Sequence, residues 1–210
     1  LEAERKSGIT VLKADNFAVG YDGVALFTTD DIDVERGETV ALIGGNGTGK
    51  STFLKTLMEQ IKPITGKFSL GHNVQIGYFA QAHDGLIGDN QVIEELMRHK
   101  DGLLISEARH ILAQYLFRGD DVFKKVSAVS GGERGRLALA ILALSGANFL
   151  ILDEPTNHLD IPAQEIMQDV LENFAGTILL VSHDRYLIDH LATQIWEVKD
   201  GHMTVFKGDY

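Results

Sequence analysis

Short apolar runs alternate with helix-like segments through the middle and the end of the chain. The runs at 38–44 (ETVALIG), 148–154 (NFLILDE) and 177–182 (TILLVS) are almost wholly apolar, as buried parallel strands are. Helical patterns follow each run, at 50–60, 162–173 and 185–191. This order predicts strand–helix–strand units around a mostly parallel sheet, which is an α/β fold.

Two other regions have a different pattern. The opening segments VLKADNFAVGY and ALFTTDDIDVERGE alternate more and carry turn residues, which predicts an N-terminal antiparallel β lobe. Between 82 and 144 helical patterns replace the strands, so we expect a helical subdomain, at about 82–147, inserted in the core. The segment TQIWEVKDGHMTVFK predicts a closing hairpin on Asp200-Gly201. We expect residues 1–8 to be a linker remnant and residues 9–210 to form a single domain.

Composition places the chain among soluble globular proteins. Of its 210 residues, 44% are hydrophobic, 30 are acidic and 19 are basic, and the formal charge of −11 disfavours non-specific attraction to nucleic acid or anionic membranes. The absence of cysteine excludes a disulfide scaffold and thiolate metal ligands. No apolar run reaches membrane-spanning length. We therefore expect a cytoplasmic protein.

A glycine-rich loop follows the first buried strand and opens a helix. Gly44, Gly49, Lys50 and Ser51 satisfy G-x-x-x-x-G-K-[ST] in that context, which is typical of a phosphate-binding loop. Its backbone N–H groups can surround phosphates, Lys50 can reach the β and γ oxygens, and the Ser51 hydroxyl can bind Mg²⁺. The alternative interpretation is a glycine-rich turn with a surface lysine.

Charged and polar side chains follow two further buried strands. Asp153 and Glu154 end one of them, at the sheet edge where open α/β sheets place their ligands. We expect Asp153 to be the Mg²⁺ partner, directly or through water, and Glu154 to polarise an attacking water. His183 follows the next strand and can reach the same site to hydrogen-bond the γ-phosphate. The alternatives are a solvated strand end for the acidic pair and a structural role for His183.

A second glycine pair lies in SAVSGGERGRLALA. Ser130, Gly131 and Gly132 stand at the start of an expected helix, where unpaired N–H groups and the helix dipole favour an anion. The alternative interpretation is a helix start with a good N-cap.

These motifs together resemble the nucleotide-binding domains of ATP-binding-cassette (ABC) proteins. GGNGTGKST, Gln81 in GYFAQ, SGGE, LILDEPTNHLD and His183 stand in that family's order along nearly the whole chain. Gly45 stands where proline is usual in the family and Val129 where leucine is common, and neither change removes a ligand. The resemblance implies a P-loop NTPase core of the RecA-like type, with ATP and Mg²⁺ as cofactors.

The resemblance also assigns roles to residues. It implies that Lys50, Glu154 and His183 act in catalysis, that Ser51, Gln81 and Asp153 hold the metal, and that the Tyr21 ring stacks on adenine, for which the alternative is a turn tyrosine in the β lobe. It implies that the nucleotide is contacted by the Walker A residues Gly44, Gly45, Asn46, Gly47, Thr48, Gly49, Lys50, Ser51 and Thr52, by the signature residues Ser130, Gly131, Gly132 and Glu133, and by Asp160 of the D-loop. In the family, two cassettes pair head to tail, so the signature serves the partner's nucleotide.

Within the family, SGGE followed by RGR, EPTNHLD, SHDRYL and FKGDY resembles the C-terminal cassette of ABC-F proteins. That resemblance implies one half of a twin-cassette soluble ATPase that acts on the ribosome in translation or ribosome protection, with a second cassette in the same chain or a second copy as partner and no membrane contact. Two alternatives remain open. The chain could be the ATP-binding subunit of an ABC transporter, or a cassette that binds ATP without turnover.

Overall fold

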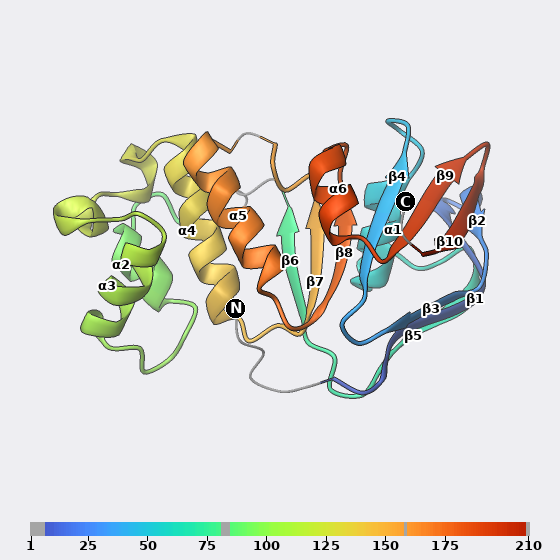
Figure 1. The fold of residues 1–210 in the computed structure, drawn as a ribbon, viewed down its shortest axis with the longest axis horizontal. Helices are drawn as coiled ribbons and strands as arrows, with labels where there is room; N and C mark the ends of the chain where they lie inside the picture. The colour runs from blue at the N-terminus through green and yellow to red at the C-terminus, as the bar shows by residue number, and fades with distance from the viewer. Residues whose placement is uncertain (1–6, 81–84, 158, 209–210) are drawn as a thin grey trace. The chain divides into compact units, whose positions relative to one another are not determined.

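The computed structural model describes residues 7–80, 85–157 and 159–208. The chain divides into two compact units. The sheet unit comprises Ala3–Tyr78, Ala147–Glu154 and Ala175–Tyr210, and the helical unit comprises Phe79–Gly146 and Pro155–Phe174. Each unit is described by itself, and Figure 1 labels their elements.

The strands of the described residues form one ten-stranded sheet in the order β3-β1-β2-β10-β9-β4-β8-β7-β6, with β5 paired to β1. Their bounds are Thr10–Tyr21 (β1), Val24–Thr29 (β2), Ile32–Glu35 (β3), Thr39–Gly44 (β4), Thr65–Leu70 (β5), Ile76–Ala80 (β6), Phe149–Asp153 (β7), Thr177–Val181 (β8), Gln194–Lys199 (β9) and His202–Lys207 (β10). Strand β1 is antiparallel to β2, β3 and β5, whereas β4 is parallel to β8 and β9, and β7 is parallel to β8. The predicted antiparallel lobe and parallel core are both confirmed.

Strand β4 is buried on both faces because a helix covers each side of it. Val40 and Leu42 belong to the main core with residues of α1 (Lys50–Leu57), whereas Ala41 packs with Ile188 of α6 (Arg185–Leu191). In Figure 1, α6 lies in front of the strands and α1 behind them. A strand covered on both faces needs apolar side chains at successive positions, which explains the unbroken apolar run in the sequence.

Helix α1 is shorter than the segment 50–60 that the pattern predicts. It ends at Leu57 because Glu59 adopts a left-handed conformation, with φ of 60°. The Gln60 N–H then donates to the Lys55 carbonyl at 2.9 Å, which satisfies one of the helix's last acceptors. The expected helices 162–173 and 185–191 are found as α5 (Ile161–Glu172) and α6.

The C-terminal hairpin joins the antiparallel lobe to the parallel core. Strands β9 and β10 are antiparallel around Asp200-Gly201, as predicted, and β10 also runs parallel to β2. The His202 ring reinforces the second pairing, because Nδ1 lies 2.9 Å from Thr28 Oγ1 and Nε2 lies 2.9 Å from Asp30 Oδ1. That parallel pairing was not predicted from the sequence.

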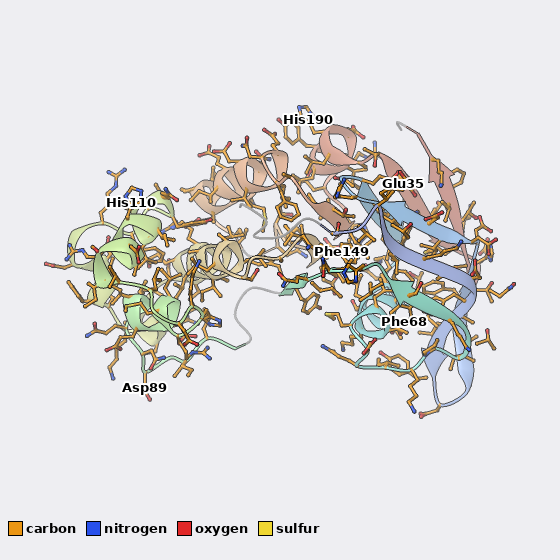
Figure 2. All side chains as sticks on the ribbon, turned by 90° about the horizontal axis from the view of Figure 1, so that it is seen from below. Glu35, Phe68, Asp89, His110, Phe149 and His190 are labelled. Carbon is orange, nitrogen blue, oxygen red and sulfur yellow. The ribbon has the colours of Figure 1, made fainter. Side chains whose placement is uncertain are left out.

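The helical unit contains α2 (Val92–Met97), α3 (Ile105–Gln114), α4 (Gly131–Leu144), α5 and two short 3₁₀ turns at Gly119–Phe123 and Val126–Ala128. Its buried core includes Leu96, Leu112 and Leu137. Figure 2 shows Asp89 and His110 among its side chains, and Phe68 and Phe149 among those of the sheet unit. An inserted helical subdomain is therefore confirmed, although its extent of about 82–147 stays a prediction.

Candidate functional site

The glycine-rich loop connects β4 to α1, as the sequence predicts. Gly44, the last residue of β4, has φ of 154°, and a Cβ placed there would lie 2.7 Å from the Val198 carbonyl oxygen. A side chain at this position would therefore displace the backbone of β9. The loop leads directly into Lys50, the first residue of α1.

Lys50 is folded onto the loop. Its Nζ donates to the carbonyl oxygens of Gly44 and Gly45 at 2.8 and 2.9 Å, and the residue is only 8% exposed. Burial lowers the pKa of this ammonium group, whereas the charges of Glu154 and Asp153 act in the opposite direction. The loop thus holds a desolvated cation whose present partners are weaker acceptors than phosphate oxygens are.

A cavity of about 510 Å³ in the sheet unit brings nine of the predicted site residues together. It is lined by Tyr21, Leu26, Asn46, Gly47, Gly49, Lys50, Ser51, Thr52, Asp153, Glu154 and Val181. In its lining, Ser51 Oγ donates to Asp153 Oδ2 at 2.8 Å. A hydroxyl and a carboxylate oxygen side by side are ligands that Mg²⁺ accepts, and it usually completes its shell with waters and substrate phosphates.

The described residues include no group of three or more His, Asp or Glu side chains that could hold a metal without such help. Gln81, the remaining predicted metal ligand, lies outside the described residues.

Glu154 combines an unusual backbone with a close histidine. Its φ of 49° is rare for a residue with a side chain, and the N–H of the same residue donates to the Val181 carbonyl at 2.8 Å. His183 Nε2 lies 3.4 Å from Glu154 Oε1, with the histidine side chain 55% exposed and the glutamate 19% exposed. The sheet edge therefore brings both predicted catalytic groups together, as the strand ends indicated.

Tyr21 lines the cavity and has a contact that the sequence did not reveal. Thr52 Oγ1 donates to the Tyr21 hydroxyl at 2.9 Å, while the tyrosine stays 46% exposed. The antiparallel lobe and α1 are thus connected at the edge of the cavity.

The signature residues and Asp160 belong to the helical unit and are not among the residues that line this cavity. Ser130 caps α4: its Oγ accepts from the Glu133 N–H at 3.2 Å, and the Glu133 carboxylate accepts from the Ser130 N–H at 2.7 Å. This is the capping box that the alternative interpretation expected. Ser130 and Gly131 are exposed at the helix start, so a nucleotide contact there stays a prediction.

Asp160 is engaged within the helical unit. It caps α5 by accepting from the Ala163 N–H at 2.9 Å, and it pairs with Arg136 of α4 at 3.0 Å. Reasoning from sequence missed Arg136, and its place three residues after the predicted SGGE site offered the only signal.

Comparisons with known proteins decide the family. The family model described as "ABC transporter" matches residues 27–157, which is more than half of the chain. The chain belongs to the ATP-binding-cassette family. Within the described residues, this cassette contains no helix long and apolar enough to cross a membrane.

Several curated relatives match nearly all of this cassette. The ATP-binding protein YdiF of Bacillus subtilis is 45% identical over 98% of the chain and 32% of its own length. ABC transporter F family member 2 of Arabidopsis thaliana is 41% identical over 97% of the chain and 30% of its own length. The protein GCN20 of Saccharomyces cerevisiae is 34% identical over 94% of the chain and 27% of its own length. The cassette therefore spans about a third of the length of these relatives.

A solved structure supports the same fold. A metal-chelate-type ABC transporter in an inward-facing conformation matches with a TM-score of 0.76, covering 94% of this cassette and 83% of that chain. Because the sequence identity is 22%, this match supports the fold and not the function.

Proposed function

We propose that this cassette binds ATP with Mg²⁺ and hydrolyses the β–γ bond, with water as the nucleophile. The observation that carries the proposal is the cavity that places Lys50, Ser51, Asp153 and Glu154 around one space in the sheet unit. These residues supply a cation, a hydroxyl and two carboxylates. Such a set suits phosphoryl transfer, in which positioning and charge stabilisation do most of the work.

The loop residues Gly44–Thr52 would hold the phosphates. Backbone N–H groups of the loop and of the α1 start face an anion favourably, because helix N-termini carry partial positive charge. Lys50 would exchange the carbonyls of Gly44 and Gly45 for the β and γ oxygens of ATP. Its low exposure makes this exchange favourable, since a buried ammonium gains more from a charged partner than from a neutral one.

Ser51 and Asp153 would hold Mg²⁺, with Gln81 as a further ligand. The 2.8 Å contact between their oxygens supports this proposal, because the two side chains already converge on one point. When bound, Mg²⁺ would neutralise charge on the β and γ oxygens. Asp153 would hold the metal, which leaves Glu154 free for another role.

Glu154 would align and polarise the attacking water, and His183 would donate a hydrogen bond to the γ-phosphate. Their separation of 3.4 Å allows both to reach the same reacting group. The left-handed backbone of Glu154 supports a functional role, because strained conformations of this kind concentrate at active sites. Tyr21 would stack on adenine at the exposed edge of the cavity.

ABC cassettes work as pairs, and we propose that Ser130, Gly131, Gly132 and Glu133, with Asp160, serve the nucleotide of a partner cassette. The exposed start of α4 supports this, because the N–H groups of Gly131 and Gly132 come before the first hydrogen bond of the helix. In this proposal residues 9–210 form a single cassette.

For the whole protein, we propose a twin-cassette ABC-F ATPase of the cytoplasm that acts on the ribosome. Relatives named as F family members support this assignment. The alternative is the ATP-binding subunit of a transporter, which the family model's description favours. The neighbouring sequence separates them: a second G-x-x-x-x-G-K-[ST] loop supports ABC-F, and membrane spans support transport.

The test of ATP binding and hydrolysis compares three variants. Lys50→Ala should lose binding of a fluorescent ATP analogue, and Glu154→Gln should bind the analogue but lose phosphate release. Lys55→Ala should bind the analogue and release phosphate as the wild type does. Lys55 is a matched control because it is an exposed lysine on the same helix. Phosphate release by Glu154→Gln at the wild-type rate would refute the role of Glu154, and unchanged binding by Lys50→Ala would refute the phosphate site.

A further inference from the structure

Arg136 connects two elements of the helical unit. It lies in the second turn of α4, its side chain is only 11% exposed, and its Nη1 lies 3.0 and 3.3 Å from the two carboxylate oxygens of Asp160. On its other side the guanidinium carbon lies 5.9 Å from the centre of the Phe117 ring. Two different neighbours therefore fix the orientation of this side chain.

Asp160 also has a second task. Its Oδ1 accepts a hydrogen bond from the Ala163 N–H at 2.9 Å, which makes it the N-cap of α5. One carboxylate thus stabilises the start of α5 and binds the arginine of α4. Displacing either helix start would strain the bonds of the other.

The backbone of α4 also lies close to the side chains that precede α5. A Cβ at Gly132 would overlap the Asp160 carboxylate, and a Cβ at Gly135 would overlap the Leu159 side chain. Only glycine allows so close a contact at these two positions of α4. The ion pair therefore forms where the helix surface already lies against the segment that precedes α5.

We propose that Arg136 is a positioning residue that fixes the start of α4, and with it Ser130, Gly131 and Gly132, to the start of α5 through Asp160. The importance of this link for catalysis rests on the proposed function, in which the signature serves a partner's nucleotide. A helix start that meets a phosphate must be held within about 0.5 Å to donate well.

Hydrogen exchange of the free cassette tests the link directly. In Arg136→Met, the amides of Glu133, Arg134 and Ala163 should exchange about tenfold faster than in wild type, which corresponds to about 1.4 kcal/mol. Arg136→Lys should recover part of the protection because it keeps the charge without the planar fork. Asp160→Asn keeps an N-cap but removes the ion pair, so it should match Arg136→Met without adding to it in the double variant.

Arg109→Met is the matched control. Arg109 lies in the same unit and its guanidinium carbon is 5.6 Å from the centre of the Phe123 ring, as Arg136 is from Phe117, but its partners do not include Asp160. The control should leave the three amides unchanged. Unchanged exchange in Arg136→Met would overturn the proposal, and so would an equal rise throughout α2 and α3, because that would mean a general loss of stability.

Pairing of cassettes tests the consequence. In the Glu154→Gln background with Mg-ATP, Arg136→Met should raise the dissociation constant of the pair about tenfold, measured by sedimentation, while ATP affinity per chain changes less than about twofold. Pairing that Arg136→Met leaves unaltered would overturn the link to the signature. If Glu154→Gln alone fails to pair, the partner is a different cassette and not a second copy of this one, and hydrogen exchange still decides whether Arg136 fixes the helix start.

Discussion

Ser51 Oγ donates a hydrogen bond of 2.8 Å to Asp153 Oδ2 and thereby joins the start of α1 to the end of β7. Neither side chain needs the other for solvation, because both lie beside the open cavity. A divalent cation that binds both oxygens would replace this hydrogen bond with two stronger contacts.

Replacing Asp153 should therefore change the effect of Mg²⁺ on ATP affinity more than it changes ATP affinity without Mg²⁺. Asp153→Asn keeps an acceptor for Ser51 but loses the charge, so the gain in ATP affinity that Mg²⁺ provides should fall by about tenfold or more. Titrations of a fluorescent ATP analogue with Mg²⁺ and with EDTA measure this gain. In EDTA the variant and the wild type should bind alike, and an equal Mg²⁺ response would contradict the assignment of Asp153.

Lys50 should make ATP binding sensitive to alkaline pH. Burial lowers its pKa, so the ammonium of the free cassette loses its proton at a lower pH than an ordinary lysine, whose pKa is about 10.4. ATP affinity should fall as pH rises through that lowered value, because the phosphates lose their cation. Lys50→Ala should bind weakly and show no such step.

The unfolding free energy should change with pH in the opposite direction to ATP affinity. Between the lowered pKa and the ordinary value the unfolded chain holds more protons than the folded one, so the unfolding free energy should rise with pH in that window. Chemical denaturation of wild type and Lys50→Ala at several pH values would measure this, and a rise of equal size in both would exclude Lys50 as its source.

Tyr21 can contribute through its ring or through its hydroxyl. If the ring stacks on adenine, Tyr21→Ala should weaken ATP binding by about 1 kcal/mol, whereas Tyr21→Trp should be tolerated. Tyr21→Phe removes the bond from Thr52 and keeps the ring, so it separates the two contributions. Equal losses in Tyr21→Ala and Tyr21→Trp would return Tyr21 to a structural role in the β lobe.

A signature that acts in trans predicts activity that rises with concentration. Activity per molecule should increase as two copies meet, and Glu154→Gln should accumulate ATP-bound pairs. Adding Ser130→Arg places a bulky cation at the exposed start of α4 and should separate these pairs while each chain keeps its own ATP. Sedimentation with Mg-ATP would measure both variants. Loss of ATP binding by Ser130→Arg in a monomer would show instead that the signature acts in cis.

Two adjacent glycines of the loop should respond differently to alanine. Gly44→Ala should destabilise the protein by more than about 1 kcal/mol, because its φ is positive and its Cβ would meet the Val198 carbonyl. Gly45→Ala should be tolerated, since the nearest atom to a Cβ there is 3.6 Å away. Denaturation followed by the fluorescence of Trp196, the only tryptophan, would compare them. Similar denaturation midpoints for Gly44→Ala and Gly45→Ala would contradict the expectation that only Gly44 requires glycine.

The sequence was most informative where function depends on short segments. The phosphate loop and the side chains at the ends of β7 and β8 were predictable, because parallel strands bring their carboxyl ends to one sheet edge. The bond between Thr52 and Tyr21 was not predictable, since it depends on how the lobe meets α1. The pairing of Arg136 with Asp160 also escaped prediction, because it depends on the close approach permitted by Gly132 and Gly135.

The turn at the end of α1 shows a similar limit. The sequence predicted a helix to residue 60, but the left-handed Glu59 ended it earlier. Glutamate carries no local signal for that conformation, which is commoner for Gly and Asn. A periodic pattern thus identified the helix and its buried face better than its end.

The place of β4 between β8 and β9 has a consequence for the growing chain. Strand β4 precedes the phosphate loop, and both of its neighbours, β8 and β9, come later in the sequence. A nascent chain that ends before Thr177 therefore contains no strand with which β4 pairs in the folded cassette. Such long-range pairing is slow to form and leaves apolar edges uncovered until late. The nucleotide pocket should therefore mature only after β8 and β9 have been synthesised, and shorter fragments of this cassette should depend on chaperones rather than on ATP for protection.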